Sequence, residues 1–250
     1  MQSWVDGQPA SALASLKDRG LAYGDGLFET IAVKAGTPLL LELHLQRLAL
    51  GCSRLAIAAD HSLIRSELLA YAQAMGEGVL KLILTRGDSL RGYGVSPGAL
   101  PRRILQASPP AAYPEAHGQQ GIVLFDCATR LAEQPLLAGL KHLNRLEQVI
   151  ARSEWQDPGY AEGLMRDTSG RVIEGVFSNL FMVRDGALIT ADLQRCGVAG
   201  VMRAALLAEA GRLGIPCHVT DISLAQLQQA DELFLCNSVY GIWPVRAFAD

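Results

Sequence analysis

The stretch GLKHLNRLEQV, residues 139–149, places Lys141 among closely mixed polar and apolar side chains. Apolar residues recur at the spacing of one helix face: Leu143, Leu146, Val149 and Ile150. We therefore predict that Lys141 lies at the start of an amphipathic helix. Desolvation disfavours an ammonium ion, so a lysine held there beside buried groups is expected to have a lowered pKa. A neutral amine is what Schiff-base chemistry needs, although most lysines are solvated surface residues.

The same stretch resembles the cofactor-lysine segment of the fold-type IV pyridoxal-phosphate enzymes. The similarity runs from YGDGLFET (residues 23–30) to CNSVYGIWPV (residues 236–245). The family includes branched-chain and D-amino-acid transaminases, which share most of these motifs. The run KHLNRLEQV (residues 141–149) is instead typical of the branch that acts on 4-amino-4-deoxychorismate. The resemblance implies a pyridoxal 5'-phosphate enzyme and, within the family, a lyase.

Composition indicates a globular protein. A chain of 250 residues can form one large domain or two modest ones, each with its own core. Half of the residues are hydrophobic and 19% are charged, which is not typical of a disordered chain. A net charge of −3 without a basic stripe argues against a nucleic-acid partner. No apolar run is long enough for a membrane span, and no secretory signal is visible at the N-terminus. These features predict a cytoplasmic protein.

The cysteines and histidines do not indicate a metal site. The five cysteines are widely and irregularly spaced, without a C-x-x-C pair, and the five histidines follow no metal-ligand pattern. We expect reduced, mostly buried thiols and no metal.

Strands and helices are predicted in mixed order along the first half. Asp6-Gly7 is a hairpin signal. The glycines on both sides of Asp25 indicate a tight bend that starts a strand, although an ordinary hairpin turn fits equally well. The expected helices cover residues 41–58 and 62–75. Residues 21–33 are expected to form a glycine turn followed by a strand, and further strands are expected at 78–86 and 103–108.

Residues 109–120, PPAAYPEAHGQQ, interrupt this pattern with three prolines and few large aliphatic residues. We predict a smaller N-terminal α/β domain (residues 1–110), a linker (111–120) and a larger cofactor-binding domain (121–250). Strands are expected at 121–127, 161–167, 172–183 and 232–236, with helices after residue 197 and from Ser223. No G-x-G-x-x-G is present, which argues against a Rossmann sheet. The predicted class is mixed α/β, with the cofactor in the interdomain cleft.

The resemblance implies the cofactor-binding residues. Lys141 would bind the cofactor covalently, and Glu174, in the apolar run VIEGVFSNLF, would pair with the pyridine nitrogen. Arg47 would bind the phosphate through its guanidinium group. The alternative is that its aliphatic carbons cover the core while the guanidinium group is solvated. The remaining phosphate contacts would come from the backbone amides of Val201 and Met202 and from the turn at Asn237 and Ser238.

The resemblance also implies the substrate residues and a homodimer. Arg91 and Tyr93 align with positions that bind a substrate carboxylate, often in the neighbouring subunit, although an isolated loop arginine is usually solvated. Tyr23 and Thr30 would border the pocket. Arg145 is a further candidate, because it could bind a carboxylate or pair with a nearby glutamate.

Two functions follow from the resemblance. The first is a lyase that converts 4-amino-4-deoxychorismate to 4-aminobenzoate and pyruvate, a step of folate biosynthesis. The second is an aminotransferase acting on D-amino or branched-chain amino acids. A non-catalytic role is disfavoured because Lys141 and Glu174 are both present.

Overall fold

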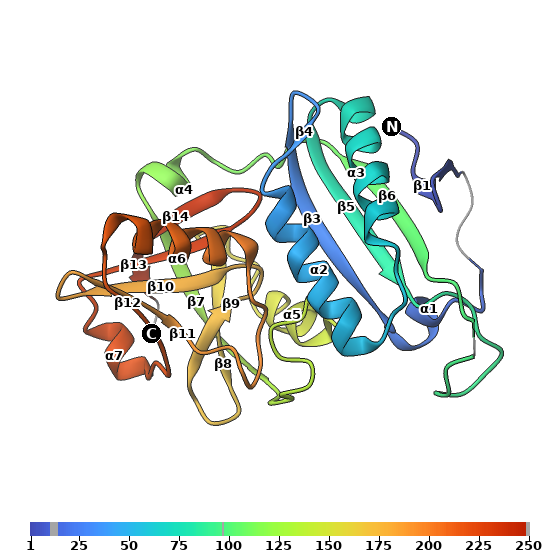
Figure 1. Ribbon diagram of the computed structural model, residues 1–250. Coiled ribbons are helices and arrows are strands. Elements are labelled where there is room, and N and C mark those ends of the chain that lie inside the picture. The colour runs from blue at the N-terminus through green and yellow to red at the C-terminus, as the bar shows by residue number, and fades with distance from the viewer. Residues whose placement is uncertain (11–14, 97, 249–250) are drawn as a thin grey trace. The chain divides into compact units, whose positions relative to one another are not determined.

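The computed structural model describes residues 1–10, 15–96 and 98–248 (Figure 1). The chain divides into two compact units. Unit 1 contains Met1–Ala111 and Leu140–Asn144, and unit 2 contains Ala112–Gly139 and Arg145–Asp250. The predicted mixed α/β class is confirmed. The segment with Lys141 belongs to unit 1, although the chain on both sides of it belongs to unit 2.

Unit 1 is an antiparallel sheet whose strand order is β2-β1-β6-β5-β3-β4 in the described part of the chain. The strands are β1 (Trp4–Val5), β2 (Gln8–Pro9), β3 (Gly26–Lys34), β4 (Thr37–Pro38), β5 (Gly78–Thr85) and β6 (Arg102–Ser108). The helices are α1 (Arg19–Tyr23), α2 (Leu41–Leu55) and α3 (His61–Met75), and α2 and α3 lie on one face of the sheet (Figure 1).

The core of unit 1 follows from the period of β5. Leu80, Leu82 and Leu84 are buried at every second position, as expected for a strand with one face against a core. They belong to one apolar cluster with Leu48 of α2 and Leu68 of α3. The helices therefore cover the sheet through their apolar stripes.

Local backbone geometry fixes the ends of the elements in unit 1. The hairpin predicted at Asp6-Gly7 is confirmed, because β1 and β2 pair around two residues with positive φ. The helix predicted to reach residue 58 ends at Leu55, since Ala56 adopts the left-handed conformation and its N–H bonds to Cys52 O. The short helix α1 was not predicted; Asp18 caps it by accepting a hydrogen bond of 2.8 Å from Gly20 N.

Unit 2 contains a larger mixed sheet with the order β12-β11-β10-β13-β14-β7-β8-β9 among the described residues. Its strands are β7 (Ile122–Leu131), β8 (Tyr160–Asp167), β9 (Val172–Gly175), β10 (Asn179–Arg184), β11 (Ala187–Ala191), β12 (Cys217–Thr220), β13 (Glu232–Asn237) and β14 (Gly241–Phe248). Its helices are α4 (Ala116–Gln119), α5 (Leu146–Arg152), α6 (Val201–Leu213) and α7 (Leu224–Gln228).

The strands of unit 2 close on themselves. Strand β9 pairs with β8 and also with β10, through the partners Glu174 and Asn179. The path from β10 through β13, β14, β7, β8 and β9 therefore returns to β10. Closure gives β9 a strand partner on both sides and fixes the residues at the closing point.

Three sequence predictions for unit 2 need correction. The strand predicted over residues 172–183 is two strands, β9 and β10, separated by a turn at 176–178. The apolar stripe predicted to bury α5 is wrong: Leu146, Val149 and Ile150 are 74%, 61% and 54% exposed, and Ala151 makes the buried contact. Helix α4 occupies part of the predicted linker. The predicted capping box at Ser223 is confirmed.

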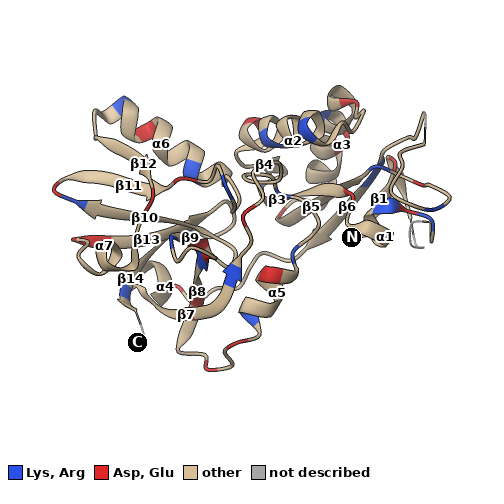
Figure 2. Cartoon of the chain, turned by 90° about the horizontal axis from the view of Figure 1, so that it is seen from below, with Lys and Arg blue, Asp and Glu red and all other residues tan. Residues whose placement is uncertain are grey.

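Charge is distributed over both units. Lys and Arg are interspersed with Asp and Glu in each (Figure 2). Among the helices that the structure describes, none combines the length and the apolar composition that a membrane crossing requires.

Glu162 is a fully buried carboxyl group in β8. Its Oε1 accepts a hydrogen bond of 2.7 Å from Val176 N, and its Oε2 accepts one of 3.3 Å from the Ser178 hydroxyl. Burial raises the pKa of Glu162 to about 8, outweighing these donors. Glu162 therefore holds the turn that separates β9 from β10 and is mostly protonated at neutral pH.

We expect Glu162 to make stability depend on pH. The folded protein keeps a proton on Glu162 that the unfolded chain releases above pH 4.5, so this contribution is full below pH 4.5 and is lost as the pH rises through about 8. In Glu162→Gln the amide keeps the same contacts without titrating. Urea unfolding across this window should show wild-type stability falling relative to the variant by up to about 1.4 kcal/mol per pH unit.

The control is Glu209→Gln in α6. Glu209 is exposed, and its hydrogen bond from Arg212 lowers its pKa, so it does not titrate in this window. This variant should keep the wild-type slope. Parallel pH profiles for wild type and Glu162→Gln would show that Glu162 is ionised in the folded protein.

Candidate functional site

Lys141 is fixed by the edge of β3 and not by a helix. Phe28 N donates a hydrogen bond of 2.9 Å to Lys141 O, and Leu143 N donates one of 3.0 Å to Gly26 O. Strand β4 pairs only with the last two residues of β3, so the first half of this edge is open to the 141–143 segment. Helix α5 begins later, at Leu146. The prediction that Lys141 starts a helix is therefore replaced by a short strand-like pairing.

The side chain of Lys141 lies against an aromatic ring. Its Nζ is 4.3 Å from the centroid of Phe28, and Nζ of Lys81 is 5.3 Å from the same ring. A ring face attracts a cation, so Phe28 gives the amine a defined place beside β3. Asn144 continues the anchoring, because its Nδ2 donates to Gly24 O at 3.2 Å. Both ends of the lysine segment are thus tied to residues 24–28.

Arg47 is part of a buried ionic cluster in unit 1. Its Nε donates to Glu29 Oε1 at 2.8 Å, and its Nη2 pairs with Oε2 of the same carboxylate. His44 Nδ1 lies 2.6 Å from Glu29 Oε2. Burial raises the pKa of Glu29, but the charge and hydrogen bonds of Arg47, with the contact of His44, outweigh it and hold the pKa below its ordinary value. Glu29 therefore orients Arg47, whose phosphate contact stays a prediction.

Glu174 lies at the closing point of the strands in unit 2 and is 3% exposed. Its Oε2 accepts hydrogen bonds from Val198 N at 2.8 Å and from Asn179 Nδ2 at 3.4 Å. Both donors are neutral. These two hydrogen bonds orient the carboxyl group at the strand closure.

Asn179 connects Glu174 to the loop before α6. Its Nδ2 also donates to Val198 O at 2.9 Å, and its Oδ1 accepts from Gly200 N at 2.9 Å. Sequence reasoning missed this residue. An asparagine inside the run VFSNLF was the available signal, because asparagine is a poor strand former and needs a local reason to be there.

Gly200 precedes α6 and presents its first amides. The first N–H groups of a helix, here those of Val201 and Met202, have no partner within the helix and suit an anion. A Cβ at Gly200 would lie 2.0 Å from Asn179 Oδ1, so only glycine fits there. The loop is also held by Gly139, whose N–H donates to Gly197 O at 2.8 Å. Gly139 lies two residues before Lys141 in the chain.

Asn237 shapes the turn that carries Ser238. Its Oδ1 accepts hydrogen bonds of 2.9 Å from the N–H groups of Val239 and Tyr240, and its Nδ2 donates to Phe177 O at 3.3 Å. Such an Asx turn uses the side chain locally. Asn237 therefore positions Ser238, and direct contact of either residue with a phosphate stays a prediction.

The predicted substrate residues are placed differently from one another. Tyr23 and Tyr93 lie side by side, with ring centroids 5.4 Å apart, and Tyr93 is 85% exposed. Arg91 is exposed in the same loop. Thr30 lies on β3, and Arg145, in unit 2, directly precedes α5.

No group of histidine, cysteine, aspartate or glutamate side chains within the described residues could hold a metal ion.

Comparison with known proteins shows similarity over nearly the whole chain. The family model for amino-transferase class IV matches residues 26–248. An aminodeoxychorismate lyase from Vibrio harveyi is 36% identical over 98% of this chain and 91% of its own. A putative branched-chain-amino-acid aminotransferase from Methanocaldococcus jannaschii is 30% identical over 94% and 82%. The crystal structure of 4-amino-4-deoxychorismate lyase from Pseudomonas aeruginosa is 65% identical, with a TM-score of 0.97 over 99% and 92%.

The contact between Gly200 and Asn179 yields a prediction. Gly200→Ala should reduce the free energy of unfolding by about 1–3 kcal/mol, because the new methyl group overlaps the Asn179 amide. In an Asn179→Ala background the overlap is gone, so the same substitution should have almost no further effect. Urea unfolding of the two single variants and the double variant measures this coupling.

Gly211→Ala is the matched control. Gly211 lies within α6, and nothing would lie within 4 Å of its new Cβ. Alanine is the better helix former, so this variant should gain about 0.5–1 kcal/mol. Additive effects of the Gly200 and Asn179 substitutions would contradict the proposed contact.

Proposed function

The chain belongs to the class IV aminotransferase family, and on that premise we propose that it is a pyridoxal-phosphate-dependent lyase. Its substrate would be 4-amino-4-deoxychorismate, and its products 4-aminobenzoate, a folate precursor, and pyruvate. The observation that carries the proposal is the near-complete similarity to a solved structure that bears the name of this lyase. The run KHLNRLEQV supports the same branch. A cytoplasmic homodimer is also proposed, and the exposed apolar residues of α5 support an interaction surface.

The side chains present fit pyridoxal 5'-phosphate. Its phosphate needs N–H, hydroxyl and cationic donors, and the family resemblance implies that the start of α6, Ser238 and Arg47 would supply them. Its pyridine nitrogen needs a buried carboxylate, and Glu174 is one with neutral donors on Oε2. Its aldehyde needs an amine, and Lys141 offers one at a defined position. When bound, the cofactor supplies an electron sink for the carbon that loses a proton.

Lys141 would have two roles. Its amine holds the cofactor between turnovers, and after the substrate amine has replaced it, the freed amine takes the proton from the amine-bearing carbon of the substrate. The C–O bond to the enolpyruvyl group then breaks and the ring becomes aromatic. Because aromatisation makes this elimination strongly favourable, the protein contributes mainly orientation and the base. Arg91, Tyr93 and Arg145 are proposed to bind the two substrate carboxylates, and Tyr23 and Thr30 to border them.

Glu174 would keep the pyridine nitrogen protonated. A protonated ring is the better electron sink, and a neutral partner in place of the carboxylate would not stabilise its charge. The contacts from Asn179 and Val198 keep this carboxylate from rotating away from its position at the strand closure.

The covalent role of Lys141 has a direct test. Borohydride reduction of the cofactor-loaded protein should fix the cofactor to Lys141, and peptide mapping of the product locates the modified residue. Lys141→Ala should lose this covalent link but still bind cofactor through the phosphate contacts. Modification of Lys17, Lys34 or Lys81 would refute the assignment, and these three lysines serve as internal controls in the same digest.

Product analysis separates the lyase from an aminotransferase. A lyase should release pyruvate and 4-aminobenzoate in equal amounts from 4-amino-4-deoxychorismate without any added keto acid. D-Alanine and branched-chain amino acids should change the cofactor spectrum only slowly, because an aminotransferase would transfer their amino group to the cofactor. Rapid spectral change with these amino acids, and no aromatic product from the chorismate derivative, would instead favour the aminotransferase.

A further inference from the structure

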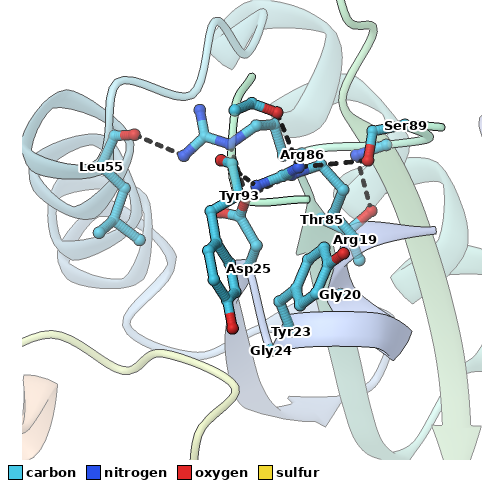
Figure 3. A network of polar contacts seen from close by, with 12 residues as sticks. Arg19, Gly20, Tyr23, Gly24, Asp25, Leu55, Thr85, Arg86, Ser89 and Tyr93 are labelled. Atoms are coloured by element: carbon cyan, nitrogen blue, oxygen red, sulfur yellow. Dashed lines mark hydrogen bonds and ion pairs between the residues drawn. The ribbon is translucent and has the colours of Figure 1, made fainter. Parts of the chain in front are cut away.

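Arg19 is a buried arginine in α1 that binds the 89–94 loop through several acceptors at once (Figure 3). It is 4% exposed. Its Nη1 donates to the Ser89 hydroxyl at 3.2 Å and to the carbonyl oxygens of Gly92 and Gly94 at 3.1 Å each. Its Nη2 donates to Tyr93 O at 3.0 Å. Four residues of one loop therefore converge on a single guanidinium group.

The other side of Arg19 is anchored through Asp25. Arg19 Nε and Arg86 Nε each donate to Asp25 Oδ2 at 2.8 Å. Arg86 also donates to Leu55 O at 2.7 Å and to Ala56 O at 2.8 Å, at the end of α2 (Figure 3). Burial raises the pKa of Asp25, but the hydrogen bonds from Arg86 and Arg19 outweigh it and lower the pKa overall, so the carboxylate stays charged. The loop is thereby tied to the rigid sheet and helix of unit 1.

The loop is otherwise held by few contacts, among them a hydrogen bond of 3.1 Å that Ser89 N donates to Lys17 O. It contains Gly92, with φ of +81°, and Gly94, and glycines lose much conformational entropy on ordering. Tyr23 adds one contact, since its hydroxyl accepts a hydrogen bond of 3.1 Å from Gly92 N. Arg19 binds the carbonyl of Tyr93 while the ring of that residue stays 85% exposed. The backbone is thus fixed and the Tyr93 side chain is presented outward.

An arginine is needed for this arrangement. The guanidinium group is planar and has five N–H donors in a rigid fork, whereas a lysine ammonium has three donors on a flexible stem. Lysine at position 19 would keep a positive charge near Asp25 but would not reach the acceptors on Ser89, Gly92, Tyr93 and Gly94 together.

We propose that Arg19, anchored by Asp25 and Arg86, is a positioning residue that sets the conformation of the 89–94 loop and thereby the affinity for substrate. The link to affinity rests on the proposed function, in which Arg91 and Tyr93 contact the substrate carboxylates. Arg19 itself acts through the loop and has no contact with the reacting atoms in this assignment.

Limited digestion of the cofactor-loaded protein tests the loop without substrate. Trypsin cleaves after Arg91 only when several neighbouring residues leave their folded positions. In Arg19→Lys we expect nicking after Arg91 to rise about tenfold, because the bonds to the loop are lost. The substitution neither adds nor removes a trypsin site, and intact mass identifies the fragment. Nicking at the wild-type rate would overturn the proposal.

Steady-state kinetics test the link to affinity. With 4-amino-4-deoxychorismate, Arg19→Lys should raise KM about tenfold with kcat nearly unchanged, since a disordered loop weakens binding more than chemistry. The absorbance of the cofactor bound to Lys141 should match the wild type. Increased nicking with an unchanged KM would refute the proposed effect of the loop on the affinity for substrate. A wild-type protein that released no product would refute the proposed function and leave the digestion result valid.

Two further variants complete the design. Arg65→Lys replaces an exposed arginine of unit 1 that pairs with Glu42, and it should match the wild type in both assays. Ser89→Ala removes one of the four loop acceptors while leaving the Arg19–Asp25 pair, and it should raise nicking about threefold. If Arg19→Lys does not fold, Ser89→Ala decides: wild-type nicking in this variant would refute the proposed restraint.

Discussion

The hydrogen bonds between β3 and the 141–143 segment are the constraint on which the candidate site depends. Phe28 and Gly26 fix the backbone around Lys141, and the Phe28 ring lies beside its amine. These contacts exist because β4 pairs only with the end of β3, which leaves the first half of that edge of β3 open, while β5 pairs along the other edge. An open strand edge is normally a liability that a protein must cover. Here it is covered by the lysine segment, so one feature protects the edge and positions a reactive group.

The same principle holds in unit 2, where the strands close at Glu174 and Asn179. A closing point cannot shift without breaking the pairing on both sides, so side chains placed there keep their geometry. Asn179 extends this rigidity to Gly200 and hence to the first turn of α6. Two groups of different chemistry, a carboxylate and a set of helix amides, are therefore held by one asparagine. Rigid elements of this kind suit a site that must keep a cofactor in one orientation.

The sequence predicts the elements whose signals are local. The Asp6-Gly7 hairpin, the capping box at Ser223 and the strand predicted over residues 78–86 from its Val/Leu/Ile run each depend on neighbouring residues, and the structure confirms them, with the strand ending at Thr85. The pairing of Lys141 with β3 could not be predicted, because its partner lies more than a hundred residues away and leaves no periodic pattern. The same reason explains why the prediction that the apolar stripe of α5 is buried was wrong. Helical spacing shows that an apolar stripe exists but not what covers it. The candidate site residues came mainly from family motifs, and Asn179 and Arg19 were missed because their roles depend on contacts distant in sequence.

The buried and half-buried carboxyl groups Asp25, Glu29, Glu162 and Glu174 differ in the groups that contact them. Arginines bind Asp25 and Glu29, and the pKa of each carboxyl group is lowered, so both groups are charged and take part in structural ion pairs. Glu162 has N–H and hydroxyl donors, and burial raises its pKa to about 8, so it carries its own proton at neutral pH. Glu174 accepts hydrogen bonds on its Oε2 from the amide of Asn179 and from the N–H of Val198, and these orient it. An oriented carboxyl group suits the protonated ring nitrogen that is proposed as its partner. A guanidinium in place of the Asn179 amide would compete with that ring for the same oxygen, which explains why a neutral residue is the appropriate neighbour.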